Sequence, residues 1–149
     1  IVAAGTVEQL EALAADPPRR ARLVPLSVAG AFHTVHMEPA IEPLAAVVSE
    51  LKPEDPKFQL LSNADGERIS NGGKFLARIV TQVANPVRWD LCMAAMATAG
   101  VTGVLELTPA GTLTGIARRN LGGVEVLSLD EPGQLNEARE FVARHSMEA

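Results

Sequence analysis

Residues 104–111 read VLELTPAG, and this stretch opens the segment that decides the fold. Its first four residues predict a short strand, and its last four predict a tight turn. Beyond the turn, apolar residues recur at helical spacing up to a pair of glycines, at Leu113, Ile116, Ala117 and Leu121. A second strand is predicted over residues 124–129, and a final helix begins at Asp130. Strand, helix and strand in this order predict a βαβ unit with parallel strands.

The same alternation of strands and helices extends towards the N-terminus. A short buried strand is predicted over residues 59–62, followed by a turn over residues 63–66. A helix then begins at Ser70 or Asn71 and ends before a proline that follows Asn85. We therefore expect an α/β fold in which part of a mostly parallel sheet is flanked by helices.

The first 29 residues predict a separate, smaller unit. Residues 1–5 resemble an apolar strand, Thr6 can cap a helix, and residues 23–28 form a second extended run. We expect residues 1–29 to be part of a small subdomain and residues 30–149 to be part of a larger α/β domain. The sequence does not start with Met, and we expect it to begin inside a domain.

Composition and charge exclude several classes of protein. The net charge of −5 does not favour a nucleic-acid partner or a surface bound to anionic lipid. No apolar run approaches the length that spans a bilayer, so no membrane partner is expected. Cys92 is the only cysteine, which excludes an intrachain disulfide and a cysteine-based zinc site. We expect a cytoplasmic protein.

The three histidines differ in their predicted positions. His145 falls in the last turn of the final helix, where we expect it to be solvated. His33 and His36 flank the start of an amphipathic helix, but Glu38 is the only nearby carboxylate, so a metal site is not favoured. On the pattern alone, a loop histidine is most simply a polar surface residue. His33, however, follows a glycine-containing loop at the predicted domain boundary, and it is a candidate general base for a serine hydroxyl.

A serine nucleophile for such a base is not visible in these 149 residues. The Gly-x-Ser-x-Gly pattern of a strained strand-to-helix turn does not occur. Ser27 is flanked by Pro25 and Ala29 where the glycines belong, and it lies in a predicted strand. We expect Ser27 to be structural.

Four stretches of the chain occur together in one known family. They are residues 1–6, residues 28–34 (VAGAFHT), residues 82–90 (QVANPVRWD) and residues 106–115 (ELTPAGTLTG). In this order and at this spacing they resemble the malonyl-CoA:acyl-carrier-protein transacylases, especially those of actinobacteria. The resemblance covers nearly the whole chain and corresponds to the C-terminal portion of the family.

The resemblance implies a two-step acyl transfer. A serine takes the malonyl group from the CoA thioester, and the phosphopantetheine thiol of acyl carrier protein then attacks the acyl-enzyme. The pathway would be fatty acid or polyketide biosynthesis. Malonyl-CoA is a substrate in this scheme, and no bound cofactor or metal is implied. The resemblance also implies a fold in which residues 1–29 end a small ferredoxin-like subdomain.

The resemblance assigns roles to four residues. His33 would be the catalytic base, and the backbone carbonyl near Gln82 would orient its imidazole. Phe32 and Gly30 would line the substrate pocket, where the phenyl ring would occupy the volume that an α-methyl group needs. One methyl-sized group is worth only about 1–3 kcal/mol of discrimination, so a preference for malonyl is expected.

Two further family features are not found in this sequence, the serine elbow and an arginine that pairs with the malonyl carboxylate. Both would belong to an N-terminal half of the same protein, which is therefore an expected partner, and without it the 149-residue chain is expected to be inactive. Arg118 and Arg119 on a late helix, and the cluster at residues 19–22, are expected to be solvated or to form a weak basic patch. Two alternatives stay open, a non-catalytic module that docks a carrier protein and a serine hydrolase that releases the acyl group to water.

Overall fold

The computed structural model describes residues 1–146 and divides into two compact units. The first unit comprises residues 1–88, and the second begins at Trp89. The subdomain boundary predicted at residue 30 is not tested by this division and stays a prediction. No helix within the described residues combines the length and apolar character needed to cross a bilayer.

The N-terminal part of the first unit contains one helix, α1 (Val7–Ala15). Thr6 and Gln9 form a capping box, in which each side chain accepts a hydrogen bond from the other residue's backbone amide. The helix capped by Thr6 is therefore confirmed. The strands predicted over residues 1–5 and 23–28 are wrong, because neither segment pairs with any other described segment.

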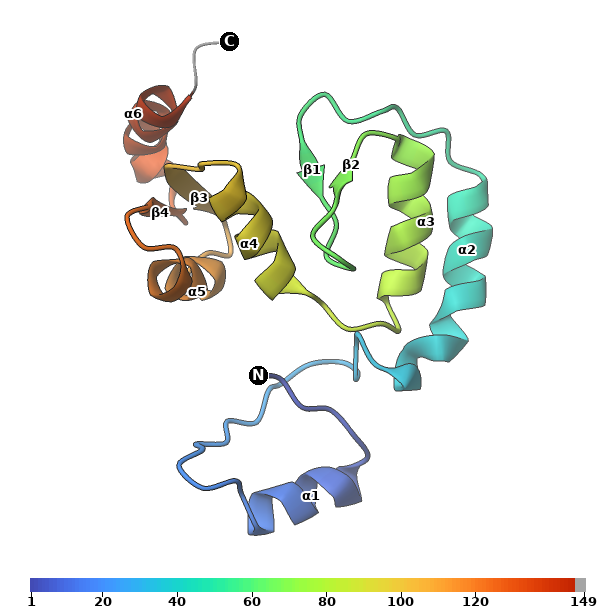
Figure 1. Cartoon of the computed structure of the whole chain (residues 1–149). Helices are drawn as coiled ribbons and strands as arrows, with labels where there is room; N and C mark the ends of the chain where they lie inside the picture. Colours follow the sequence, from blue (N-terminus) through green and yellow to red (C-terminus); the bar gives the residue numbers. More distant parts are fainter. Residues whose placement is uncertain (147–149) are drawn as a thin grey trace. The chain divides into compact units, whose positions relative to one another are not determined.

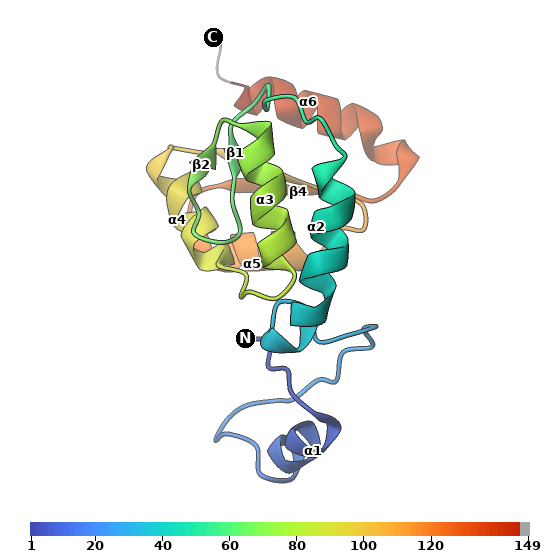
Figure 2. The same cartoon turned by 90° about the vertical axis from the view of Figure 1, so that its right-hand side faces the viewer.

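The rest of the first unit packs two helices beside a short hairpin (Figures 1 and 2). Its elements are η1 (Val35–Ala40), α2 (Ile41–Ser49), β1 (Leu60–Leu61), β2 (Arg68–Ile69) and α3 (Gly72–Gln82). Helices α2 and α3 lie side by side. Asn71 caps α3 by accepting a hydrogen bond from the amide of Lys74, as expected for one of the two predicted caps. Gly72 is required there because a Cβ would overlap the backbone carbonyl of Glu54.

The predicted strand at residues 59–62 is shorter than expected and has an unexpected partner. β1 pairs antiparallel with β2, with Leu60 opposite Ile69, so the intervening turn closes a hairpin. Arg78 on α3 binds this turn through Asp65 at 2.6 Å and the neighbouring Glu67 at 3.0 Å. These ion pairs are about one-third exposed or more, so they fix position more than they add stability.

The second unit is built around a pair of parallel strands. Its elements are α4 (Trp89–Thr98), β3 (Gly103–Leu107), α5 (Thr112–Asn120), β4 (Glu125–Leu129), η2 (Pro132–Gln134) and α6 (Leu135–His145). β3 and β4 are in register from the pair Gly103–Glu125 to the pair Leu107–Leu129. Helices α5 and α6 contact both strands and cover opposite faces of them (Figures 1 and 2). The predicted βαβ unit, and with it the α/β class, is confirmed.

The prediction that His145 is solvated is wrong. Its ring nitrogens lie 2.9 Å from the Thr102 hydroxyl and 2.8 Å from the Glu125 carboxylate, and its side chain is 17% exposed. Its ring also contacts Phe141 at a centroid distance of 4.5 Å. His145 therefore ties the end of α6 to the start of both parallel strands, a set of contacts between residues far apart in the sequence.

The turn at residues 108–111 is closed by the buried side chain of Glu106. Its carboxylate accepts hydrogen bonds from the backbone amides of Gly111 (2.8 Å), Leu113 (2.9 Å) and Thr114 (2.8 Å) at the start of α5. Burial by itself would raise the pKa of Glu106, but the three amides together outweigh burial and lower the pKa to about 2. These amides are therefore occupied and cannot also bind a phosphate.

We predict that Glu106→Gln removes an acid-dependent part of the stability. Because the folded-state pKa of about 2 lies below the ordinary 4.5, the wild-type carboxylate stabilises the fold above pH 4.5 and loses this effect as the pH falls towards 2. The difference in thermal midpoint between wild type and variant should therefore be largest above pH 4.5 and shrink towards pH 2. Glu140→Gln on the exposed surface of α6 is the control, and an equal response of both variants would contradict the prediction.

Candidate active site

The C-terminal end of α3 holds His33 at two points. The backbone amide of His33 donates to the carbonyl of Val83 at 2.8 Å, and its ring Nδ1 lies 2.8 Å from the carbonyl oxygen of Gln82. The last carbonyls of a helix have no partner inside the helix, so they are available to a segment that arrives from elsewhere. The loop before η1 is therefore bound to α3 through His33 itself.

The contact with Gln82 determines where the imidazole carries its hydrogen. A carbonyl oxygen can only accept, so Nδ1 must be the protonated nitrogen of the neutral ring. Nε2 then keeps its lone pair, and no group within residues 1–146 forms a hydrogen bond with it. His33 is exposed, so this lone pair can reach a reactant. A neutral imidazole held in this tautomer can act as a general base.

The backbone of His33 adopts the left-handed conformation, with φ at +65°. This conformation is uncommon for residues other than glycine, and it marks a position that the surrounding structure enforces. Thr34 stabilises the turn, because its hydroxyl donates to the carbonyl of Ala31 at 2.7 Å and accepts from the amide of His36 at 3.3 Å. The sharp turn allows the ring and the amide of one residue to meet neighbouring carbonyls.

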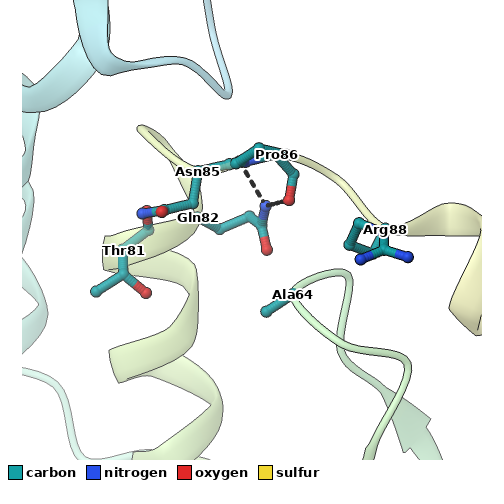
Figure 3. A pocket seen from close by; sticks show the side chains of 6 residues that line it. All are labelled: Ala64, Thr81, Gln82, Asn85, Pro86 and Arg88. Atoms are coloured by element: carbon teal, nitrogen blue, oxygen red, sulfur yellow. Dashed lines mark hydrogen bonds between the residues drawn. The ribbon is translucent and has the colours of Figure 1, made fainter. Parts of the chain in front are cut away.

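The side chain of Gln82 points into the loop that follows α3 (Figure 3). Its Nε2 donates to the carbonyls of Asn85 at 2.8 Å and Pro86 at 2.9 Å. An open hollow of ≈ 480 Å³ lies beside this loop and is lined by Ala64, Thr81, Gln82, Asn85, Pro86 and Arg88. The backbone carbonyl of Gln82 thus binds the imidazole, and the side chain of Gln82 binds the loop.

Phe32 and Gly30 lie next to each other in the loop before η1. Phe32 is 49% exposed, so its ring is available for contact with a further molecule or segment. A Cβ at Gly30 would meet the Phe32 ring at 3.5 Å and the Met37 sulfur at 3.4 Å, which are ordinary contact distances. The described residues therefore do not require glycine at position 30.

The structure brings two of the four predicted site residues, His33 and Gln82, into direct contact. The catalytic roles of both, and the pocket roles of Phe32 and Gly30, stay predictions. Sequence reasoning missed Val83, whose carbonyl binds the His33 amide, and treated Asn85 only as a helix stop. An asparagine just after a helix is a signal for a side chain that satisfies the last carbonyls, and Asn85 does donate to Thr81 at 2.7 Å.

A metal site at His33 and His36 is the other use considered for these histidines. No group of three or more His, Cys, Asp or Glu side chains gathers within residues 1–146 in a way that could hold a metal ion. His33, His36 and Glu38 are not gathered into such a group within these residues.

Comparison with known proteins relates the chain to one kind of enzyme. It is 46% identical over 137 residues to the malonyl CoA-acyl carrier protein transacylase of Mycobacterium tuberculosis, which covers 92% of this chain and 45% of that protein. The crystal structure of MCAT from Mycobacterium tuberculosis matches with a TM-score of 0.84 at 44% identity, over 89% of this chain and 44% of that one.

A complex is also among the similar structures. The complex PlMCAT:AntF, a type II PKS acyl-carrier protein with its malonyl-transacylase, matches with a TM-score of 0.73 at 28% identity, over 78% of this chain and 38% of that one. The chain spans about half the length of the curated relatives it matches. No protein-family model matches it.

We predict that glycine is preferred over alanine at position 33. Because φ is +65°, His33→Gly should be more stable than His33→Ala by about 1 kcal/mol, measured by urea denaturation. His36 is the matched control, since it lies within η1 and the order should reverse there by about 0.5 to 1 kcal/mol. The same order at both positions would contradict the left-handed conformation of His33.

Proposed function

Because the chain is homologous to the C-terminal portion of the malonyl CoA-acyl carrier protein transacylases, we propose that it supplies the histidine base of such an enzyme. The reaction is the transfer of a malonyl group from CoA to the phosphopantetheine thiol of acyl carrier protein. The observation that carries the proposal is the hydrogen bond between His33 Nδ1 and the Gln82 carbonyl, which leaves Nε2 as a base. The proposed location is the cytoplasm.

In the proposed mechanism His33 moves one proton in each direction during each half-reaction. Nε2 accepts the serine proton as the serine oxygen attacks the thioester carbonyl, and the imidazolium then protonates the departing CoA thiolate. In the second half-reaction Nε2 accepts the proton of the carrier thiol and returns it to the serine oxygen. The Gln82 carbonyl stabilises the Nδ1–H tautomer throughout without carrying a charge.

The serine and the arginine for the malonyl carboxylate would come from a portion that corresponds to the first half of the relatives. This chain spans 45% of the mycobacterial relative and contains no Gly-x-Ser-x-Gly sequence. We propose that residues 1–29 end a ferredoxin-like subdomain and that residues 30–149 form part of a mostly parallel sheet. The exposed apolar side chains of residues 23–28 support this, since such a surface gains stability when a further part of the protein covers it.

The transfer itself can be tested in the full-length protein that contains this chain. The protein is incubated with malonyl-CoA and a holo acyl carrier protein, the kind of partner that is bound in the PlMCAT:AntF complex. Mass spectrometry should then show a carrier protein that is heavier by one malonyl group. His33→Ala should lower kcat by about 10³-fold or more, whereas His36→Ala should leave it within about twofold. Release of free malonate without a malonyl-carrier product would instead indicate a hydrolase, and neither product would indicate a docking module.

We predict that Phe32 disfavours a methyl-branched substrate. Phe32→Ser should raise the ratio of kcat/KM for methylmalonyl-CoA to that for malonyl-CoA by about 10-fold, because the smaller side chain leaves room for the methyl group. Phe58→Ser, at a residue that is 87% exposed and lies outside this loop, is the control. An unchanged ratio in the Phe32 variant would contradict the prediction.

A further inference from the structure

We propose that the side chains of Gln82 and Asn85 are positioning residues, which together aim the Gln82 carbonyl at the His33 imidazole. The geometry of the loop after α3 carries this proposal. Its catalytic consequence rests on the proposed function, whereas its structural consequence, the tautomer of His33, does not.

Gln82 and Asn85 exchange two hydrogen bonds. The backbone amide of Asn85 donates to the Gln82 carbonyl at 3.2 Å, and the Gln82 side-chain amide donates back to the Asn85 carbonyl at 2.8 Å. The same Gln82 amide group also donates to Pro86 at 2.9 Å (Figure 3). The Gln82 carbonyl that meets His33 is therefore also bound by the backbone amide of Asn85, and the Gln82 side chain in turn holds Asn85 in place.

Asn85 attaches this closed loop to the helix. Its side-chain Nδ2 donates to the carbonyl of Thr81 at 2.7 Å, one turn back in α3. Pro86 has no amide hydrogen and cannot donate to the Gln82 carbonyl as the next residue of a helix would, so the loop is held by the side-chain donors of Gln82 and Asn85. Without them, the peptide of Gln82 could rotate, and its carbonyl would no longer point at Nδ1.

The chain contains a matched asparagine that separates positioning from ordinary capping. Asn120 ends α5 and donates from Nδ2 to the carbonyl of Ile116 at 2.8 Å, the same spacing and nearly the same length as at Asn85. No carbonyl at that helix end binds a histidine ring among the described residues. A substitution at Asn120 therefore removes a comparable hydrogen bond without touching the site.

The experiment uses the full-length protein with ¹⁵N-labelled histidine and two variants. Gln82→Met keeps the side-chain length and the backbone carbonyl but removes both donated hydrogen bonds, and Asn85→Ala removes the bond to Thr81. In the wild type we expect His33 to carry its hydrogen on Nδ1, with the resonance assigned by its loss in His33→Ala. In both variants the fraction of that tautomer should fall, and it should stay unchanged in Asn120→Ala.

The kinetic expectation is a split between kcat and KM. Because only the base is misaligned, kcat for malonyl transfer should fall by about 10- to 100-fold in Gln82→Met and Asn85→Ala, with KM for malonyl-CoA within about twofold. Asn120→Ala should match the wild type. Asn85→Ser, whose hydroxyl can still donate, should recover part of the loss, which a general destabilisation would not explain.

Distinct outcomes would overturn each proposal. A wild-type His33 without the Nδ1–H tautomer, or variants that retain both tautomer and kcat, would overturn the positioning role while leaving malonyl transfer intact. A wild type that transfers no malonyl group would overturn the proposed function, and the tautomer measurement would still decide the positioning role. If one variant fails to fold by circular dichroism, the other decides; if both fail, the wild-type tautomer and Asn85→Ser decide.

Discussion

The end of a helix leaves carbonyl oxygens that need hydrogen-bond donors, and the candidate site depends on how α3 meets this need. Its donors come from His33, 49 positions earlier in the chain than Gln82, and from the loop that follows the helix. Because one of those donors is an imidazole nitrogen, satisfying the helix also selects a tautomer. The left-handed turn at His33 lets the ring and the amide meet successive carbonyls. A requirement of secondary structure thus leaves the Nε2 of an exposed imidazole unprotonated.

At the start of α5, in the second unit, the backbone groups that need partners are donors and not acceptors. They are amides, and the Glu106 carboxylate accepts hydrogen bonds from three of them. The two solutions differ in what they leave available. A carboxylate engaged by three amides is a structural anchor, and it closes a helix N-terminus that would otherwise suit an anion. An imidazole bound through one nitrogen still presents the other nitrogen to a reactant.

Local signals predicted much of the secondary structure. The capping residues Thr6 and Asn71 and the strand–helix–strand order of residues 103–129 all depend on groups a few positions apart, so the sequence pattern contains the necessary information. The predictions failed where partners are distant. The segment at residues 23–28 has strand composition, but no strand among the described residues pairs with it. His145 has a helix-end position but bonds Thr102 and Glu125 at the start of the two parallel strands.

In the candidate site, too, the local features could be read from the sequence, whereas the contacts between distant residues could not. The sequence alone shows that a histidine follows a glycine-containing loop and predicts that a helix ends near an Asn-Pro pair. The resemblance adds the prediction that these two features belong to one site. The resemblance also placed a backbone carbonyl near Gln82 beside the imidazole, and the structure identifies it as the carbonyl of Gln82 itself. That Val83 binds the His33 amide, and that the Gln82 side chain binds Asn85 and Pro86, could be learned from the tertiary structure alone. The reason is that every residue has a backbone carbonyl, so composition cannot distinguish one from another. The packing of the His33 loop against the end of α3 selects which carbonyl meets the imidazole.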